Sequence, residues 1–162
     1  MAEIQVIVDH RLPLPVAWWT ALVGLAVRLL PAGNATFGRP VTVHLTPELQ
    51  RHNGQLAGGL HHELKDRSSY IFVTVWTLPL EAGLQRFWIA GLLATLCHEL
   101  WHAFETGNAA TAPESEEEPR AYLAAVHGLA NLLALPALSH DFGGLLAELD
   151  RRLTIGTLEI AA

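Results

Sequence analysis

The residues with the clearest chemical potential are two histidines and a glutamate that stand close together in the chain. They form the segment His98-Glu99-Leu100-Trp101-His102, an H-E-x-x-H pattern, inside a long apolar stretch with helical character. Two histidines four residues apart lie on the same side of a helix, at a separation that suits two ligands of one zinc ion. The glutamate between them is placed to act as a general base. The pattern therefore predicts a catalytic zinc site.

The helix that carries this pattern is expected to run from about residue 81 to residue 104. Its opposite side is apolar and can pack into a core through Ile89, Leu93, Leu96 and Leu100. Ala94 and Gly91 lie one and two turns back along the histidine face. These small residues leave room for a ligand, or for another helix packed against this one.

The third zinc ligand should come from a different element. A catalytic zinc site normally has three protein ligands and one position open to water. The acidic cluster after the long helix is the natural source, and it contains Glu114, Glu116, Glu117 and Glu118. Glu118 stands at the start of the next expected helix, with Tyr122 one turn further on the same face. Glu116 and Glu117 remain alternative ligands, and all these acids could instead be solvated residues near a helix N-terminus.

These two segments resemble the gluzincin group of zincin metallopeptidases, and in particular short metallopeptidases encoded by phages and prophages. Those proteins combine an H-E-x-x-H helix with a nearby Glu-x-x-Ala-Tyr, which corresponds here to Glu118-Pro119-Arg120-Ala121-Tyr122. The similarity covers about residues 70 to 135. It implies Zn²⁺ as cofactor, the metal ligands His98, His102 and Glu118, and the base Glu99.

The motif and the resemblance together predict a zinc-dependent hydrolase that cleaves peptide bonds. Zinc would lower the pKa of a bound water toward about 7, and Glu99 would take its proton and later deliver it to the leaving amine. Tyr122 is a candidate donor to the developing oxyanion, although packing is the commoner role for such a residue. If residues 70–76 form the edge strand of a sheet, they can pair with an extended peptide. A peptide or protein is therefore the expected substrate.

Two alternatives from other functional classes remain open. The same ligands could hold zinc in a binding module that has a closed fourth position or no usable cleft. The chain could also be a metal-free interaction protein whose apolar helices form an oligomer. The sequence does not determine the oligomeric state.

The composition is that of a globular protein without a nucleic-acid partner. Hydrophobic residues make up 51 % of the 162 residues and charged residues 16 %, which excludes a disordered chain. The net charge of -6 and the lack of a basic cluster argue against nucleic acid. The single cysteine, Cys97, is expected to be a small buried residue. With no targeting pattern and no apolar run long enough to span a bilayer, a cytoplasmic protein without a membrane partner is expected.

The elements that position these residues follow from periodicity and from breaks in the chain. Strands are expected at residues 3–9, 41–46, 60–64 and 70–77. A short helix is expected at Thr46-Pro47-Glu48. Longer helices are expected at residues 15–30, 81–104, 119–135 and 141–153. This order predicts a single α+β domain over residues 1–162, a small zincin-like domain with a mixed sheet of three or four strands and one early helix, then a helical half.

The other histidines carry weaker signals. His61 and His62 are expected at the surface, or less often at the rim of a cleft, because no further histidine follows at helical spacing. His44 alternates with the core residues of its strand and is expected to be exposed. His127 lies nine residues after Glu118, about 180° around the helix, and should face away from the site.

Overall fold

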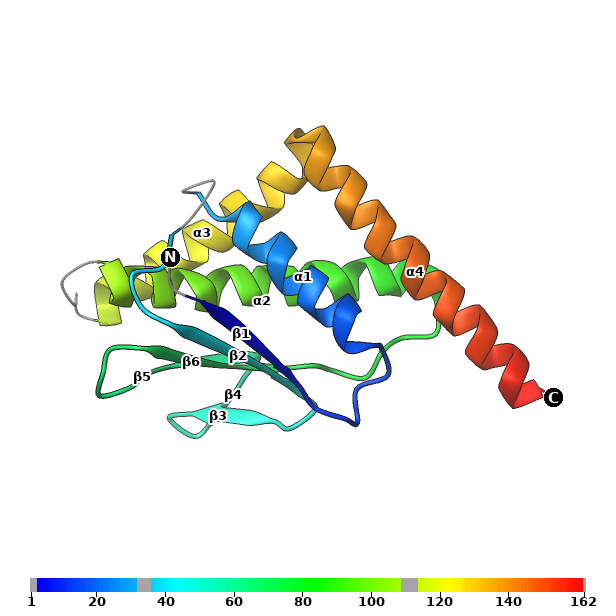
Figure 1. The fold of residues 1–162 in the computed structure, drawn as a ribbon, viewed down its shortest axis with the longest axis horizontal. Helices are drawn as coiled ribbons and strands as arrows, with labels where there is room; N and C mark the ends of the chain where they lie inside the picture. Colours follow the sequence, from blue (N-terminus) through cyan, green and yellow to red (C-terminus); the bar gives the residue numbers. More distant parts are fainter. Residues whose placement is uncertain (1–2, 32–35, 109–113, 162) are drawn as a thin grey trace.

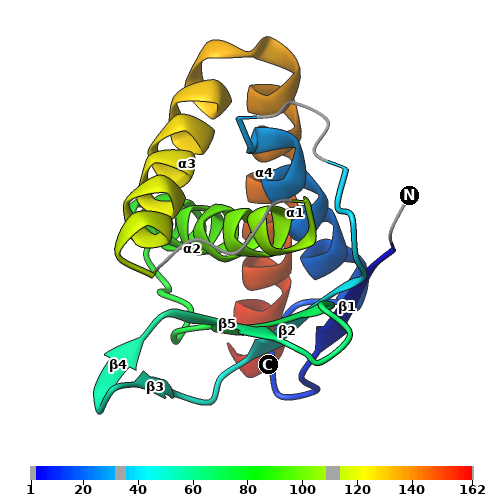
Figure 2. The same cartoon turned by 90° about the vertical axis from the view of Figure 1, so that its left-hand side faces the viewer.

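The computed structural model describes residues 3–31, 36–108 and 114–161, in which helices lie on one side of a sheet (Figures 1 and 2). The sheet has the order β1-β2-β6-β5, formed by β1 (Ile4–Val8), β2 (Val41–Thr46), β6 (Ser69–Thr74) and β5 (Gly59–Glu63). A separate hairpin consists of β3 (Gln50–His52) and β4 (Gln55–Ala57). The helices are α1 (Val16–Leu29), α2 (Ala82–Asn108), α3 (Glu114–Ala134) and α4 (Pro136–Ala161). The predicted α+β class is confirmed.

Strand register decides which side chains face the helices. β1, β2 and β6 are parallel, and β5 is antiparallel to β6. Since side chains alternate between the two faces of a strand, the aligned row Val6, Val43, Ile71 and His61 shares one face. Val43 and Ile71 are fully buried in the core, so this face is the one that the helices cover. His61 therefore points toward the helical layer.

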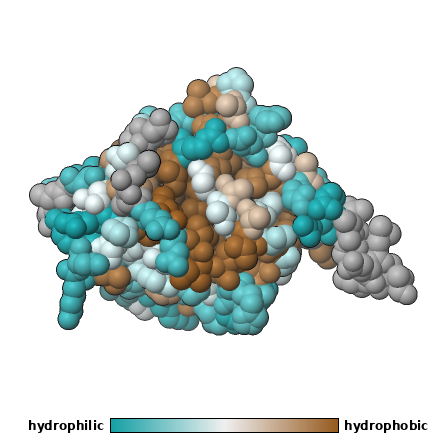
Figure 3. Space-filling model, viewed as in Figure 1, coloured by the Kyte–Doolittle hydropathy of each residue, from teal (hydrophilic) through white to brown (hydrophobic). Residues whose placement is uncertain are grey.

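An aromatic cluster joins the early helix to the long one. Trp18 and Trp19 of α1 lie with their ring centroids 6.2 and 6.0 Å from that of Trp88 on α2. The indole of Trp19 is fully buried and donates a hydrogen bond to the carbonyl of Leu14. The outer side of α1 is also apolar, and Figure 3 shows apolar surface over α1 and the neighbouring strand β1. The tryptophan pair is thus part of the core.

Small residues and one ion pair bring α3 close to α2. Ala121 and Ala124 are buried where α3 crosses α2, and their short side chains allow a close approach of the two backbones. The guanidinium of Arg120 donates to the carboxylate of Glu105 at 2.6 Å. These contacts place the first turns of α3 beside the histidine-bearing part of α2, as seen in Figure 2.

The last helix leaves the domain at a sharp angle. Pro136 begins α4, and the Arg28 guanidinium on α1 donates to Asp141 near that end of the helix. The far end of α4 extends beyond the remaining elements in Figure 1. No single helix in the described ranges has the length and apolarity needed to cross a membrane, although α3 and α4 pass that test as a pair bent by 92°.

Several expected boundaries are corrected by the structure. The helix predicted at Thr46 is absent. Thr46 ends β2, and the carbonyls of Thr46 and Glu48 accept hydrogen bonds from the Val75 amide and the Thr74 hydroxyl, which hold this bend against β6. The chain then enters the β3–β4 hairpin, whose turn has positive φ at both Asn53 and Gly54, the requirement of a tight two-residue hairpin turn. Pro119 does not begin its helix but lies inside α3.

Residues 70–76 do not meet the condition set for pairing with a peptide, because β6 is not an edge strand. β6 pairs with β2 on one side and with β5 on the other, so β5 forms the edge nearest α2. Periodicity identified β6 as a strand but contains no information about its neighbours in the sheet.

Candidate metal centre

Three side chains from two helices converge at one point. His98 and His102 lie one turn apart on α2, and their Nε2 atoms are 3.3 Å apart. The two carboxylate oxygens of Glu118, on α3, lie 2.9 Å from His102 Nε2 and 3.4 Å from His98 Nε2. These residues form a group able to hold a metal ion. The structure thus brings together the three residues that the sequence analysis singled out.

The spacing of these donor atoms suits a small divalent cation. Zinc–nitrogen and zinc–oxygen distances are about 2.0–2.2 Å, and tetrahedral geometry then places neighbouring donor atoms roughly 3.3 Å apart. The two histidine Nε2 atoms are 3.3 Å apart, and each lies 2.9 or 3.4 Å from one of the two Glu118 oxygens, which is close to that value. Burial, followed by the neighbouring His102, lowers the pKa of His98, so its ring is neutral near pH 7 and able to bind a metal.

Glu99 lies deep in the same cleft but outside the ligand group. Its side chain is buried between α2 and β5. Burial raises the pKa of this carboxyl to about 8, and the negative charge of Glu118 adds to the effect. The helix turns Glu99 about 100° away from His98, toward the backbone of β5.

A glycine on β5 makes room for Glu99. A Cβ atom at Gly59 would lie 2.6 Å from Glu99 Cγ and 2.7 Å from Oε1, too close without movement. We expect Gly59→Ala to lower the free energy of unfolding by about 1–3 kcal/mol, as overpacking does in other cores. Urea denaturation measures this change.

Gly58→Ala is the matched control for this substitution. Its new Cβ would make only ordinary contact, 3.7 Å from Thr95 Oγ1, so we expect a change below about 0.5 kcal/mol. Adding Glu99→Ala to Gly59→Ala should restore most of the lost stability by removing the clash. Equal effects at Gly58 and Gly59 would show that the close approach of Glu99 has no energetic weight.

The site opens into a cleft of about 740 Å³. Its walls are α2, the start of α3, β5 and the β3–β4 hairpin, with His52, Gln55 and Leu56 contributed by the hairpin. The Leu56 side chain is 53 % exposed and lines this wall. The volume falls within the roughly 300–1,000 Å³ that is usual for ligand sites.

His61 belongs to this cleft, contrary to the preferred expectation of a surface position. The side chain is half-buried, and its ring stacks on His102 with centroids 5.8 Å apart and planes 15° apart. His61 Nε2 lies 2.8 Å from the Ser69 hydroxyl. Burial, followed by the charges of His102 and His62, lowers the pKa of His61 to about 4. The neutral imidazole of His61 therefore packs against the ring of the candidate ligand His102.

Sequence reasoning could not have found His61 with certainty, because its orientation depends on the register of β5 against β6. His61 pairs with Ile71 and faces the helices, whereas His62 pairs with Tyr70 and faces outward. The strand predicted at residues 60–64 indicated only that neighbouring side chains point to opposite faces of the sheet. It did not indicate which of them would face the helices.

Tyr122 and the other acids occupy distinct positions around the ligands. The Tyr122 ring packs edge-on against His98, with centroids 4.6 Å apart, and remains 64 % exposed at the cleft. Glu117 also lines the cleft, while Glu116 is exposed outside it. Of the acids in the described part of this cluster, Glu118 alone joins the histidine pair.

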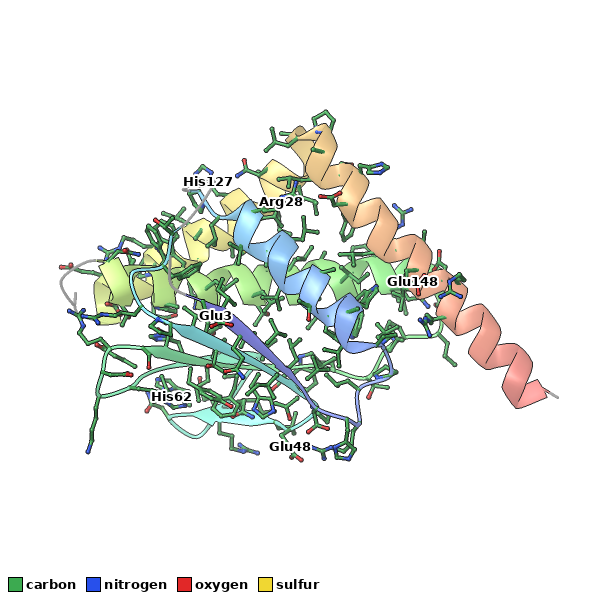
Figure 4. All side chains as sticks on the ribbon, in the orientation of Figure 1. Glu3, Arg28, Glu48, His62, His127 and Glu148 are labelled. Carbon is green, nitrogen blue, oxygen red and sulfur yellow. The ribbon has the colours of Figure 1, made fainter. Side chains whose placement is uncertain are left out.

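The remaining candidates lie away from the centre. Cys97 is buried with its thiol donating to the carbonyl of Ala26, and burial raises its pKa to about 12, as expected for a small core residue. His44 is half-buried against Tyr70 and Phe72 rather than exposed. Figure 4 shows His127 on α3 and His62 on the sheet at opposite sides of the molecule.

No protein-family model, curated protein or solved structure matches this chain. The description of this protein therefore rests on its fold and its candidate site. It is an α+β protein whose long helix and following helix form a His-His-Glu group that could hold a metal ion.

Proposed function

We propose that this protein is a zinc-dependent hydrolase that cleaves peptide bonds. His98, His102 and Glu118 would hold the zinc ion, a ligand set typical of catalytic zinc because three protein ligands leave a fourth position for water. The observation that carries the proposal is the convergence of His98, His102 and Glu118, which each offer one ligand atom within 4.8 Å of the other two. They meet in a cleft that also contains the buried carboxyl of Glu99.

The chain's own residues account for the proton transfers that hydrolysis requires. When bound, zinc supplies a Lewis acid that lowers the pKa of water to about 7. Glu99, in its ionised carboxylate form, accepts the proton as the water oxygen bonds to the peptide carbonyl carbon. It then delivers that proton to the nitrogen as the C–N bond breaks, which leaves a carboxylate and an amine. The Tyr122 hydroxyl, at the open side of His98, is the candidate donor to the carbonyl oxygen.

The edge strand β5 supports a peptide as the substrate. Its residues Gly59, Leu60 and His61 line the cleft, and among the described strands of the sheet β5 pairs with β6 alone. The unpaired backbone groups of an edge strand can add an extended peptide as a further strand. The sequence allowed this role for residues 70–76 only if they formed the sheet edge. Because β6 lies inside the sheet, β5 is the strand that offers it.

We expect the purified protein to bind about one zinc per chain and to cleave peptides only in that form. Protein dialysed against a chelator should lose cleavage of a mixed peptide library, and one equivalent of zinc should restore it. Mass spectrometry of the products measures cleavage, and metal analysis measures occupancy. The reason is that the proposed chemistry needs the Lewis acid as well as the base.

The other outcomes identify the alternatives. One zinc per chain without cleavage of any peptide in the library would favour a non-catalytic zinc-binding module. Failure to bind zinc at micromolar concentration would overturn the metal centre and favour an interaction protein.

A further inference from the structure

A second hollow lies beside the cleft, between the end of β6 and the first half of α2. It has a volume of about 240 Å³ and is lined by Thr74, Trp76, Phe87, Trp88, Gly91, Leu92 and Thr95. None of these side chains is charged. The volume is below the roughly 300 Å³ at which small-molecule sites begin, so the hollow suits one large side chain rather than a whole ligand.

The hollow and the metal centre lie along one face of α2. Residues spaced by three or four positions share a helix face, and such a series runs from Leu84 through Trp88, Gly91, Thr95 and His98 to His102. Thr95 lines both the cleft and the hollow. A chain bound in the cleft therefore reaches the hollow without leaving this face.

Three aromatic side chains line the hollow, of which Trp88 is held in place and Phe87 and Trp76 are exposed. The Trp88 indole donates to the carbonyl of Trp76 at 3.0 Å, and its ring stacks on Trp18. Phe87 is 76 % exposed and Trp76 is 49 % exposed. Large apolar side chains held at the rim of a hollow favour an apolar occupant, because binding removes their surface from water.

We propose that this hollow is a subsite for an aromatic or large aliphatic side chain of the bound peptide. The inference rests on the proposed function, since it needs a peptide in the cleft. Gly91 lies seven residues before His98, about 10 Å along the helix. An extended peptide advances roughly 3.3 Å per residue, so the recognised side chain lies about three residues from the bond that is cut.

The direction of β5 places this residue on the C-terminal side of the cut. A Cβ at Gly58 would contact Thr95, one at Gly59 would contact Glu99, and His61 stacks on His102. β5 and α2 therefore run in the same direction. A peptide paired antiparallel to β5, which is the more stable pairing, points its C-terminal part toward the hollow.

The test compares peptides that differ only at this position. With zinc-loaded protein, we expect kcat/KM for peptides with Phe at the second to fourth residue after the cut to exceed that for Ala by about 10- to 100-fold. Gly91→Phe should bring this ratio close to one, because a Cβ at Gly91 meets open space and the new ring can fill the hollow. Gly83→Phe is the control on the same helix, since it also meets open space but does not line the hollow.

A binding measurement separates this inference from the proposed function. In the zinc-loaded Glu99→Gln variant, tryptophan fluorescence should report the Phe peptide binding at least tenfold tighter than the Ala peptide, and Gly91→Phe should remove the difference. Cleavage without any preference would overturn the subsite alone. Preference in binding without cleavage by the unaltered protein would support the subsite and overturn the hydrolase. Neither binding nor cleavage would overturn both.

Discussion

The Glu99→Gln variant is expected to retain one zinc per chain while its kcat for peptide cleavage falls by about 10²- to 10⁴-fold, the usual contribution of a general base. Glutamine has nearly the same shape, so it fits the space against Gly59 that the carboxyl occupies. Its amide cannot accept the proton of the attacking water. Glu99 lies outside the ligand group, and so the metal should stay. Steady-state kinetics on one verified peptide and metal analysis of the same sample measure both effects.

Glu81→Gln provides the matched control for this change. Glu81 is an exposed acid just before α2, and its replacement by glutamine should leave both kcat and zinc content unchanged. Full activity in Glu99→Gln would remove this residue from the proposed chemistry. Loss of zinc together with activity would instead indicate that Glu99 supports the metal.

The second large effect is expected at His102. Its side chain is 8 % exposed, the most buried of the three candidate ligands, and its Nε2 contacts both Glu118 and His98. His102→Ala should weaken zinc binding by more than about 100-fold, since even partners that only orient a ligand are worth 10- to 100-fold in metal affinity. Competition with a coloured chelator measures the affinity. Zinc at 100 times its Kd should stabilise the unaltered protein by about 2.7 kcal/mol, and this gain should disappear in the variant.

Histidine and glutamate controls test whether the loss is specific. His127→Ala removes an exposed histidine of α3 and should leave zinc affinity unchanged. Glu118→Gln should weaken binding strongly, whereas Glu117→Gln should have little effect because Glu117 lies in the cleft outside the ligand group. If Glu117→Gln weakened zinc binding strongly and Glu118→Gln had little effect, the third ligand would be Glu117.

The local elements of this fold were predictable because each depends on neighbours in sequence. Alternation over Val41–Thr46 predicted β2 with its observed bounds. The histidine spacing predicted two imidazoles on one face of α2, since helical geometry alone brings residues four apart together. The Asn53-Gly54 turn carried a hairpin signal of the same local kind, although the only element expected next to it was the short helix at Thr46-Pro47-Glu48.

The choice among the glutamates needed contacts between distant segments. The acidic cluster offered several acids at similar separations from His102. Glu118 meets the histidines because buried Ala121 and Ala124 let α3 approach α2, and because Arg120 pairs with Glu105. Helix starts are hard to read in such a segment, and Pro119 inside α3 shows that a proline near the start need not be the first helical residue.

The sequence by itself determined the α+β class, the histidine pair with Glu99 between them and the acidic segment that would complete the site. These features follow from periodicity and residue type over a few turns of chain. Only the tertiary structure decided that β5 forms the edge beside the cleft, that His61 stacks on His102 and that Gly59 makes room for Glu99. Strand order, strand register and helix packing set these contacts. Alternative pairings have similar local energies, so the packing of the whole core decides which one forms.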